Sequence, residues 1–251
     1  MTGKLHVVGL GPGDPMLMTP QVAEIVAQAS DIIGYQTYVA RVPLRADQNR
    51  HASDNREEIA RARNALELAQ QGRRVCVVSS GDAGVFAMAS AIFEAIETGP
   101  DEWRALDVEV LPGISAMFAV AARLGAPLGH DFCAISLSDN LKPWDLITHR
   151  LRKAAEADFV ISLYNPISKA RPWQLGAAFD ILREVKSPET PVVFATAVSR
   201  ADENIVIEPL KDADPERADM RTLVMIGSSA TRAIERPGGA QWLYTPRRAE
   251  R

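Results

Sequence analysis

The chain has 251 residues, of which 47% are hydrophobic and 24% are charged, and its formal net charge at pH 7 is −4. This composition is typical of a soluble globular protein, and the length allows one large domain or two domains of about 120 residues each. Because long runs of Lys and Arg are absent before the last few residues, binding to nucleic-acid phosphates is not expected.

Neither a membrane span nor a metal site is expected. The longest uncharged apolar stretch, around 110–122, is interrupted by Pro112 and Gly113 and is too short to cross a bilayer. The four histidines form no HExxH or CxxC-type cluster. Cys76 and Cys133 lie in apolar, strand-like runs, which favours two buried free thiols in a reducing compartment. We therefore expect a cytoplasmic protein without a metal ion.

The first element is a strand that ends in a glycine turn. Residues 5–10 form a short apolar run, and residues 9–14 contain three glycines, a proline and an acid. Glycine permits backbone angles that other residues resist and lets a ligand approach the main chain closely. Thr19 and Pro20 then predict the N-cap and first position of a helix. In an open parallel sheet, a ligand crevice lies at such a strand end.

Strands and helices alternate through the rest of the first half. After the first helix, with its stripe over 22–29, a polar segment begins at Arg41, and glycine turns follow two of the later strands, at 79–84 and 112–116. The expected strands are 31–35, 74–79 and 106–111, and the further helices run from about Ser53 to Gly72, from 85 to 99, and from 116 to 124.

The segment 125–130, with two glycines and a proline, is the expected linker. It divides the chain into domains 1–126 and 127–251. The second half should hold helices at 143–157 and 172–186 and strands at 133–137, 159–164, 191–198, 204–210 and 222–226, followed by a tail from Arg236 in which Trp242 and Tyr244 pack. The pattern predicts an α/β fold with a mostly parallel N-terminal sheet and a mixed C-terminal sheet, because the strands 191–198 and 204–210 are close enough to pair antiparallel.

The glycine turns do not fit a dinucleotide site in detail. Asp14 stands where the G-x-G-x-x-G motif has its third glycine, and its carboxylate would repel a pyrophosphate. The strand that ends at Gly34 and Tyr35 also lacks the usual ribose-binding acid. Turns with small residues and acids suit a cationic or zwitterionic ligand with a ribose, such as S-adenosylmethionine. One such turn alone is more often only a tight turn, but four at strand ends favour a ligand site.

Five motifs in order resemble one known family, the tetrapyrrole (uroporphyrinogen/corrin) methyltransferases, over nearly the whole chain. They are Val8-Gly9-Leu10-Gly11-Pro12-Gly13-Asp14, Ser80-Gly81-Asp82-Ala83-Gly84-Val85, Leu111-Pro112-Gly113-Ile114-Ser115-Ala116, Leu163-Tyr164-Asn165-Pro166 and Met225-Ile226-Gly227-Ser228. Within the family, the second and fourth motifs are most similar to the branch that methylates C17 of precorrin-3B. Many relatives have G-D-P in the second motif, where Ala83 stands here.

The resemblance implies two α/β domains with S-adenosylmethionine folded between them, a tetrapyrrole in an adjoining trough, and a homodimer. It implies methylation of C17 of precorrin-3B in cobalamin biosynthesis, coupled to ring contraction that extrudes C20 as a bound acetyl group and yields precorrin-4. S-adenosylhomocysteine would be the second product. The cobalt-precorrin-3 C17-methyltransferase of the anaerobic route, or another corrin-pathway methyltransferase, stays open. A dinucleotide-dependent oxidoreductase and a non-catalytic nucleotide-binding module are the alternatives outside the family.

The family's cofactor contacts can be carried over position by position, loosely near residue 197. They fall on Gly11, Pro12, Gly81, Asp82, Val85, Ser115, Ala116, Tyr164, Asn165, Ala197, Val198, Thr222 and Leu223.

Acids in the expected cleft are candidates for the proton transfer that ring contraction requires: Asp82 first, then Asp14, then Asp139. For each of them the alternative is that the carboxylate only caps a turn or helix. The substrate carboxylates should be bound by cationic and polar side chains, although each alone is more often a solvated surface charge. The candidates are Arg41, Arg45, His51, Ser138 and Arg200, with Arg50 and Arg123 as further possibilities.

Overall fold

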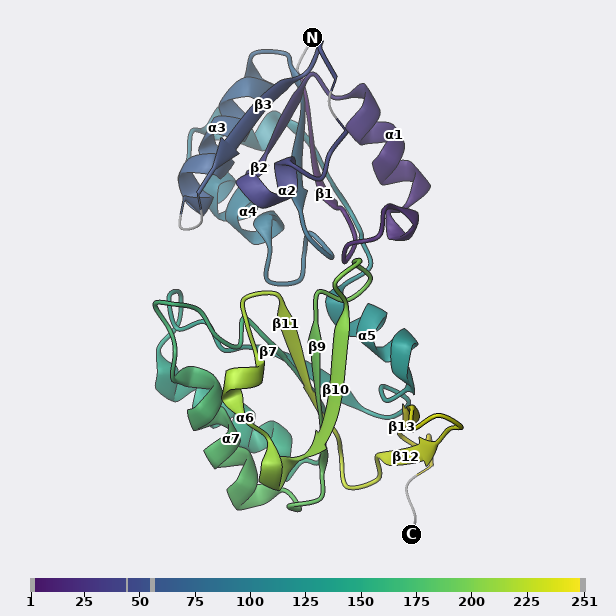
Figure 1. Cartoon of the computed structure of the whole chain (residues 1–251). Coiled ribbons are helices and arrows are strands. Elements are labelled where there is room, and N and C mark those ends of the chain that lie inside the picture. The colour runs from purple at the N-terminus through teal and green to yellow at the C-terminus, as the bar shows by residue number, and fades with distance from the viewer. Residues whose placement is uncertain (1–2, 44, 55–56, 249–251) are drawn as a thin grey trace. The chain divides into compact units, whose positions relative to one another are not determined.

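The computed structural model describes residues 3–43, 45–54 and 57–248. The chain divides into two compact units that join between Ser115 and Ala116 (Figure 1). The segment expected as a linker lies inside the second unit, because helix α5 (Ala116–Leu124) and the short strand β6 (Gly125–Ala126) both pack there. Each unit has its own sheet, helices and core, as the α/β prediction requires.

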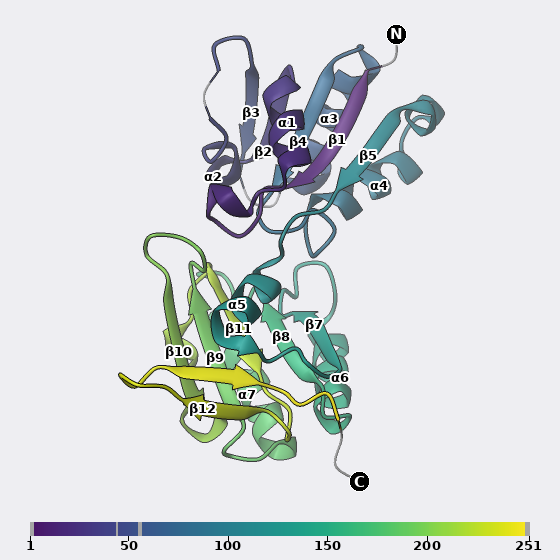
Figure 2. The ribbon, with the colours of Figure 1, turned by 90° about the vertical axis from the view of Figure 1, so that its right-hand side faces the viewer.

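The first unit is built on a five-stranded, fully parallel sheet in the order β3-β2-β4-β1-β5. Helix α1 covers one face of this sheet, and helices α3 and α4 cover the other (Figure 2). The elements are β1 (Lys4–Gly9), α1 (Pro20–Gln28), β2 (Asp31–Tyr35), α2 (Gln36–Val39), β3 (Asn49–Ser53), α3 (Glu58–Gln70), β4 (Arg74–Ser79), α4 (Met88–Thr98) and β5 (Asp107–Leu111), with single 3-10 turns at Pro15–Leu17 and Asp101–Ala105.

Alternating side chains of the strands supply two separate cores. Val7 of β1 and Val77 of β4 face α3 and α4, whereas their neighbours Val8 and Val78 face α1 and α2. A strand that is covered on both faces is apolar along nearly its whole length. This explains why these strands were readable as continuous apolar runs.

Strand β3 was missed by the sequence prediction. Its residues Asn49–Ser53 are polar or small, and β3 lies at the edge of the sheet, with β2 as its one neighbour. An edge strand with an exposed face needs no apolar pattern, so the polar residues of β3 predicted a loop where the structure has a strand. The following helix consequently begins at Glu58 and not at Ser53.

The second unit has a mixed five-stranded sheet in the order β10-β9-β11-β8-β7, in which β7 and β8 are parallel and the other neighbours antiparallel. The predicted antiparallel pairing of 191–198 with 204–210 is therefore confirmed. The remaining elements are β7 (Phe132–Ser136), α6 (Trp144–Glu156), β8 (Val160–Tyr164), α7 (Gln174–Val185), β9 (Pro191–Thr196), β10 (Asn204–Pro209), β11 (Thr222–Ile226), β12 (Arg232–Glu235) and β13 (Gln241–Tyr244), with 3-10 turns at Leu210–Asp212 and Pro215–Arg217.

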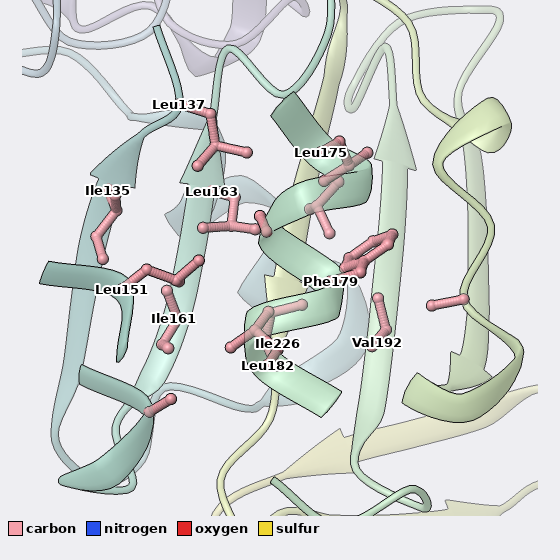
Figure 3. Close-up of a cluster of buried hydrophobic side chains, with 14 of the residues drawn as sticks. Ile135, Leu137, Leu151, Ile161, Leu163, Leu175, Phe179, Leu182, Val192 and Ile226 are labelled. Atoms are coloured by element: carbon pink, nitrogen blue, oxygen red, sulfur yellow. The ribbon is translucent and has the colours of Figure 1, made fainter. Parts of the chain in front are cut away.

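One face of this sheet packs against α6 and α7 around a large apolar cluster (Figure 3). The rings of Phe179 on α7 and Phe194 on β9 meet edge to face, with centroids 5.9 Å apart. Such aromatic pairs stabilise a core by about 0.5–1.5 kcal/mol beyond their buried area. Helix α5 and strands β12 and β13 lie over the opposite face of the sheet (Figure 2).

The C-terminal segment is more ordered than the expected tail. Strands β12 and β13 form an antiparallel hairpin, and β13 pairs in parallel with β6. The turn between them contains Gly238 and Gly239, both with positive φ, and Leu243 is buried as an anchor. Across the residues that the structure describes, every helix is too short or too polar to cross a membrane.

Candidate functional site

The three glycine turns of the first unit meet at the carboxyl ends of β1, β4 and β5. Gly11 and Gly81 exchange two backbone hydrogen bonds, of 3.1 and 2.9 Å. Both residues have positive φ, +72° and +67°, which favours glycine. A Cβ on Gly113 would lie 2.2 Å from the carbonyl oxygen of Gly81. The main chains of residues 9–14, 79–86 and 111–115 therefore touch directly, and we call these residues the loop cluster.

Asp82 ties two turns of the loop cluster together. Its Oδ1 accepts a hydrogen bond from the N–H of Gly84 at 2.8 Å, and its Oδ2 accepts one from the N–H of Gly113 at 2.9 Å. Such bonds are charge-assisted and hold an ionised carboxylate as an acceptor. The alternative that Asp82 caps the following helix is wrong, because the N-cap of α4 is Ala87 and carries no side-chain cap hydrogen bond. The carboxylate instead caps its own turn at Gly84 and binds the third turn at Gly113.

The other predicted residues of this unit lie in or beside the loop cluster. Asp14 accepts a hydrogen bond from Met16 N at 2.9 Å and so caps the 3-10 turn that follows it. Pro12 and Ser115 are buried, and Val85 is partly exposed. The structure thus brings the first-unit cofactor candidates to one edge of the parallel sheet.

Arg41 also reaches the loop cluster, but its guanidinium is held by protein oxygens. Nη1 donates to Ser80 Oγ at 3.0 Å, and Nη2 donates to the carbonyls of Leu10 and Gly11 at 3.1 and 3.0 Å. These three hydrogen bonds attach Arg41 to the first and second turns, and its binding of a substrate carboxylate stays a prediction.

Two further substrate candidates lie elsewhere in the first unit. His51 Nε2 is 2.9 Å from Oδ1 of the fully buried Asp31, which is the first residue of β2, at the amino end of the sheet. Arg45 forms an ion pair of 2.6 Å with Asp47 in an exposed loop. Neither side chain is brought to the loop cluster by the described contacts. Arg50 donates to the backbone carbonyls of Val39, the last residue of α2, and of Val42 and Pro43 just after it.

In the second unit, the predicted residues gather at one edge of the mixed sheet. The carboxyl ends of β7, β8 and β9 lie there with the start of the antiparallel β11, because Ser136 is in register with Tyr164, and Thr196 with Thr222. We call this the polar edge; its residues are 136–139, 164–165, 196–200 and 222–223.

Tyr164 and Asn165 form the centre of the polar edge. Tyr164 Oη accepts a hydrogen bond from Met117 N at 3.1 Å, which ties the first turn of α5, beginning at Ala116, to β8. Asn165 has a left-handed backbone with φ of +50°, and its side-chain amide donates to Ser136 Oγ at 2.9 Å. Asparagine tolerates this left-handed backbone, and the side-chain hydrogen bond to Ser136 holds Asn165 in place at the end of β8.

Asp139 and Ser138 lie beyond the end of β7. Asp139 Oδ2 accepts from Nε2 of the buried Gln174 at 3.1 Å, and the N–H of Ser138 donates to Ser136 Oγ at 3.3 Å. Burial lowers the pKa of Arg171, and the negative charge of Asp139 opposes that shift. Asp139 is thus held by an amide on α7 and lies near a guanidinium.

The turn after β9 completes the polar edge. Ala197 has a left-handed φ of +51°, Val198 is buried beside it, and Arg200 donates its backbone N–H to the carbonyl of Ala197 at 3.0 Å. Thr222 Oγ1 lies 2.8 Å from Thr196 Oγ1. The neighbouring Leu223 is buried in β11, and Arg123 is paired with Glu203, 3.0 Å between Nε and Oε2.

Sequence reasoning missed three polar residues that hold these loops. Ser80 binds Arg41, Ser136 binds Asn165, and Arg171 Nη1 donates to the carbonyl of Asn165 at 3.1 Å. Ser80 stands inside a quoted motif and could have been found there. Arg171 follows Asn165 by six residues in an irregular loop, and only its charge marks it.

Comparison with known proteins identifies the family. Residues 4–214 match the family described as Tetrapyrrole (Corrin/Porphyrin) Methylases. The chain is 61% identical over 247 residues to the Precorrin-3B C(17)-methyltransferase of Sinorhizobium sp, covering 98% of this chain and 97% of that protein. It is 43% identical over 230 residues to the Probable cobalt-factor III C(17)-methyltransferase of Salmonella typhimurium, covering 90% and 93%. The chain therefore belongs to the tetrapyrrole methylase family.

Solved structures agree with this assignment. The crystal structure of the methyltransferase CobJ superposes with a TM-score of 0.92 at 53% identity, over 97% of this chain and 100% of that one. The uroporphyrin-III C-methyl transferase of Thermus thermophilus, complexed with S-adenosylhomocysteine, gives a TM-score of 0.69 at 22% identity over 90% and 92% of the two chains. At that identity the second match shows a shared fold.

Proposed function

We propose that the chain is an S-adenosylmethionine-dependent methyltransferase that methylates C17 of precorrin-3B in cobalamin biosynthesis, with ring contraction to precorrin-4. The observation that carries this proposal is the 61% identity to a precorrin-3B C(17)-methyltransferase over almost the full length of both chains. The presence of all five glycine-containing or Asn-Pro motifs at strand ends of the two sheets supports it.

The chemistry of methyl transfer matches a site made largely of main chain. The methyl group of a sulfonium is already activated, so the protein has to align sulfur, methyl and the attacking carbon and to exclude water. Proximity and orientation can supply about 7–11 kcal/mol of such a barrier. The closely packed backbone of the loop cluster is suited to hold a ligand in one fixed position, because rigid surroundings preserve a near-attack geometry.

We assign the methyl-donor contacts to the candidates in each unit. In the first unit these are the turns around Gly11, Gly81 and Ser115, and in the second unit they are the main chain and side chains of Tyr164, Asn165 and Thr222 with their neighbours. The left-handed backbone at Gly11, Gly81 and Asn165 marks sharp turns at the strand ends, and turns rich in glycine leave main-chain groups open to a ligand.

Ring contraction needs a hydrogen bond to, or a proton from, the C20 oxygen. Asp82 has both oxygens bonded to backbone N–H groups, which favours a role in holding the loops. Asp139, next to Ser138 and bonded to Gln174, then becomes the stronger candidate for contact with the tetrapyrrole, with Arg200 of the same edge as a carboxylate ligand. Asp14, which the sequence placed ahead of Asp139, caps its own turn and becomes the weakest of the three.

The decisive experiment is incubation of the purified protein with S-adenosylmethionine and metal-free precorrin-3B. We expect S-adenosylhomocysteine and a product with the mass and absorbance of precorrin-4. A parallel incubation with cobalt-factor III tests the alternative that the Salmonella relative suggests. If only cobalt-factor III is turned over, it and not precorrin-3B is the substrate. If neither compound is turned over, the assignment is refuted.

A titration with S-adenosylhomocysteine and with NADP separates this proposal from a dinucleotide-dependent oxidoreductase. Binding of the first ligand alone supports the methyltransferase, and binding of NADP alone contradicts it. The homodimer that the family resemblance implies and the cytoplasmic location expected from two buried free thiols stay predictions. Light scattering after size-exclusion chromatography tests the first, and cell fractionation tests the second.

A further inference from the structure

Arg41 links the first two turns of the loop cluster. It follows the short helix α2, and its side chain is half-buried. One nitrogen of its guanidinium, Nη1, donates to Ser80 of the second turn at 3.0 Å. The other, Nη2, donates to the carbonyls of Leu10 and Gly11 in the first turn at 3.1 and 3.0 Å. In the sequence, Leu10 and Gly11 precede Arg41 by 31 and 30 residues, and Ser80 follows it by 39.

The link is coupled to the backbone bridge between the same two turns. The carbonyl oxygen of Gly11 accepts the N–H of Gly81 at 2.9 Å and the guanidinium of Arg41 at 3.0 Å. Movement of the first turn would therefore break both interactions together. A planar guanidinium with several fixed donors can hold three oxygens in different directions, whereas a lysine ammonium acts as a single point charge.

We propose that Arg41 is a positioning residue for the methyl donor, which acts by keeping the first and second turns of the loop cluster in one arrangement. This inference rests on the proposed function, because it takes those turns as part of the S-adenosylmethionine site. It replaces the simpler expectation that Arg41 binds a substrate carboxylate. Hydrogen bonds to charged groups are among the stronger ones, so their loss should be visible in ligand affinity.

The test compares Arg41→Met and Arg41→Lys with wild type and with Arg104→Met. Arg104 is a matched control in the same unit: it donates to Asp101 at 2.6 Å and to the carbonyl of Glu97 at 3.3 Å, beyond the end of α4. The measurements are the Kd for S-adenosylhomocysteine by calorimetry, KM for S-adenosylmethionine, KM for the tetrapyrrole, kcat at saturation, and Tm.

For Arg41→Met we expect Kd for S-adenosylhomocysteine and KM for S-adenosylmethionine to rise about tenfold or more. The KM for the tetrapyrrole and kcat at saturating cofactor should change less than about threefold, because no group that touches the reacting atoms is removed. Arg41→Lys should fall between Arg41→Met and wild type, and Arg104→Met should match wild type. If Arg41→Met does not fold, Arg41→Lys, which keeps the charge and most of the stem, supplies the same comparison.

A second comparison tests the link itself. Ser80→Ala should weaken S-adenosylhomocysteine binding in the wild type by about two- to threefold but add little in the Arg41→Met background, because the two residues form one unit. Additive effects of the two substitutions would contradict the link.

Other outcomes overturn the proposal. A raised KM for the tetrapyrrole with an unchanged Kd for S-adenosylhomocysteine would return Arg41 to carboxylate binding. An unchanged Kd in both Arg41 variants would leave Arg41 without a role in cofactor binding. These results differ from failure of the proposed function itself, in which the wild-type protein neither binds S-adenosylhomocysteine nor forms a methylated product.

Discussion

Asp31 is the buried charge on which the stability of the first unit should depend most. Its carboxylate is fully buried and lies 2.5 Å from Arg73 Nε, 2.9 Å from His51 Nε2 and 2.7 Å from Ser30 Oγ. Burial alone would raise the pKa of Asp31, but the hydrogen bonds from Arg73, His51 and Ser30 outweigh burial, so the pKa lies below its usual value. The perturbation we consider is Asp31→Asn, which keeps the shape and removes the charge.

The expected loss follows from the geometry. Two opposite charges about 4 Å apart interact by about 4 kcal/mol at an effective dielectric constant of about 20. The side chain of Arg73 is 37% exposed and that of His51 is 32% exposed, so solvent screens a good part of this energy, and the neutral amide also avoids the desolvation cost of a buried carboxylate. We therefore expect Asp31→Asn to lower the free energy of unfolding by about 2 kcal/mol, a Tm decrease of about 4–8 °C.

The pH dependence gives an independent check. Because the folded-state pKa of Asp31 is depressed, its contribution is fully present above the unfolded-state pKa and is lost as the pH falls through the folded-state value. The stability difference between wild type and Asp31→Asn should thus be present at about pH 5, above the unfolded-state pKa of about 3.9, and should shrink towards about pH 3 and below.

Urea unfolding followed by circular dichroism and tryptophan fluorescence measures both effects. Asp47→Asn is the matched control, since the Asp47 side chain is 71% exposed in its pair with Arg45, and solvent-exposed ion pairs contribute little to stability. A loss below about 0.5 kcal/mol for Asp31→Asn, or a difference that does not narrow in acid, would refute the reasoning.

Three other substitutions or reagents test the site and the core. Gly113→Ala places a Cβ 2.2 Å from a carbonyl oxygen of the second turn and should lower the free energy of unfolding by about 1–3 kcal/mol or more. The control Gly176→Ala, in which the nearest atom to the new Cβ is 3.5 Å away, should stabilise helix α7 by about 0.5–1 kcal/mol. Equal Tm values for the two variants in thermal unfolding would contradict the close contact at Gly113. Asp82→Asn puts an amide against one of two backbone N–H donors and should weaken S-adenosylhomocysteine binding about tenfold, and unaltered binding and turnover would exclude both a loop-holding and an acid–base role. Burial raises the pKa of Cys76 to about 12, so in a Cys133→Ser variant a thiol reagent at about pH 8 should label it only after unfolding, and rapid labelling of the native protein would show that the thiol is accessible.

The parts of the fold that the sequence predicted are those with strong hydrophobic patterns. Strands β1, β4 and β11 are buried along nearly their whole length, and continuous apolar runs identify such strands. Strand β3, which is polar and lies at the outside of the first sheet, and the exposed strand β12 carry no such pattern. Their pairing depends on backbone hydrogen bonds to a neighbour that is distant in the sequence or follows a glycine turn, and single residues do not encode those partners.

The site shows the same division between position and role. The motifs placed Gly11, Gly81 and Tyr164 at strand ends, as the structure has them. The partners of charged side chains were less predictable, because no local sequence pattern connects a charge with a partner from a distant part of the chain. Arg41 binds the carbonyls of a turn, and His51 faces a carboxylate twenty residues away at the opposite end of the sheet.

Backbone carbonyls explain why the contacts of Arg41 could not be predicted from the sequence. Every residue carries a carbonyl, so no sequence pattern distinguishes the oxygens of Leu10 and Gly11 that accept its guanidinium. A loop that binds its ligand through main-chain groups has few side chains with which to stabilise itself, and glycine adds conformational freedom that must be restrained on folding. A cation donated from another element restrains such a loop without filling the space that the ligand needs. An arginine that takes no part in the chemistry, such as Arg41, can therefore affect cofactor affinity by restraining a glycine-rich turn.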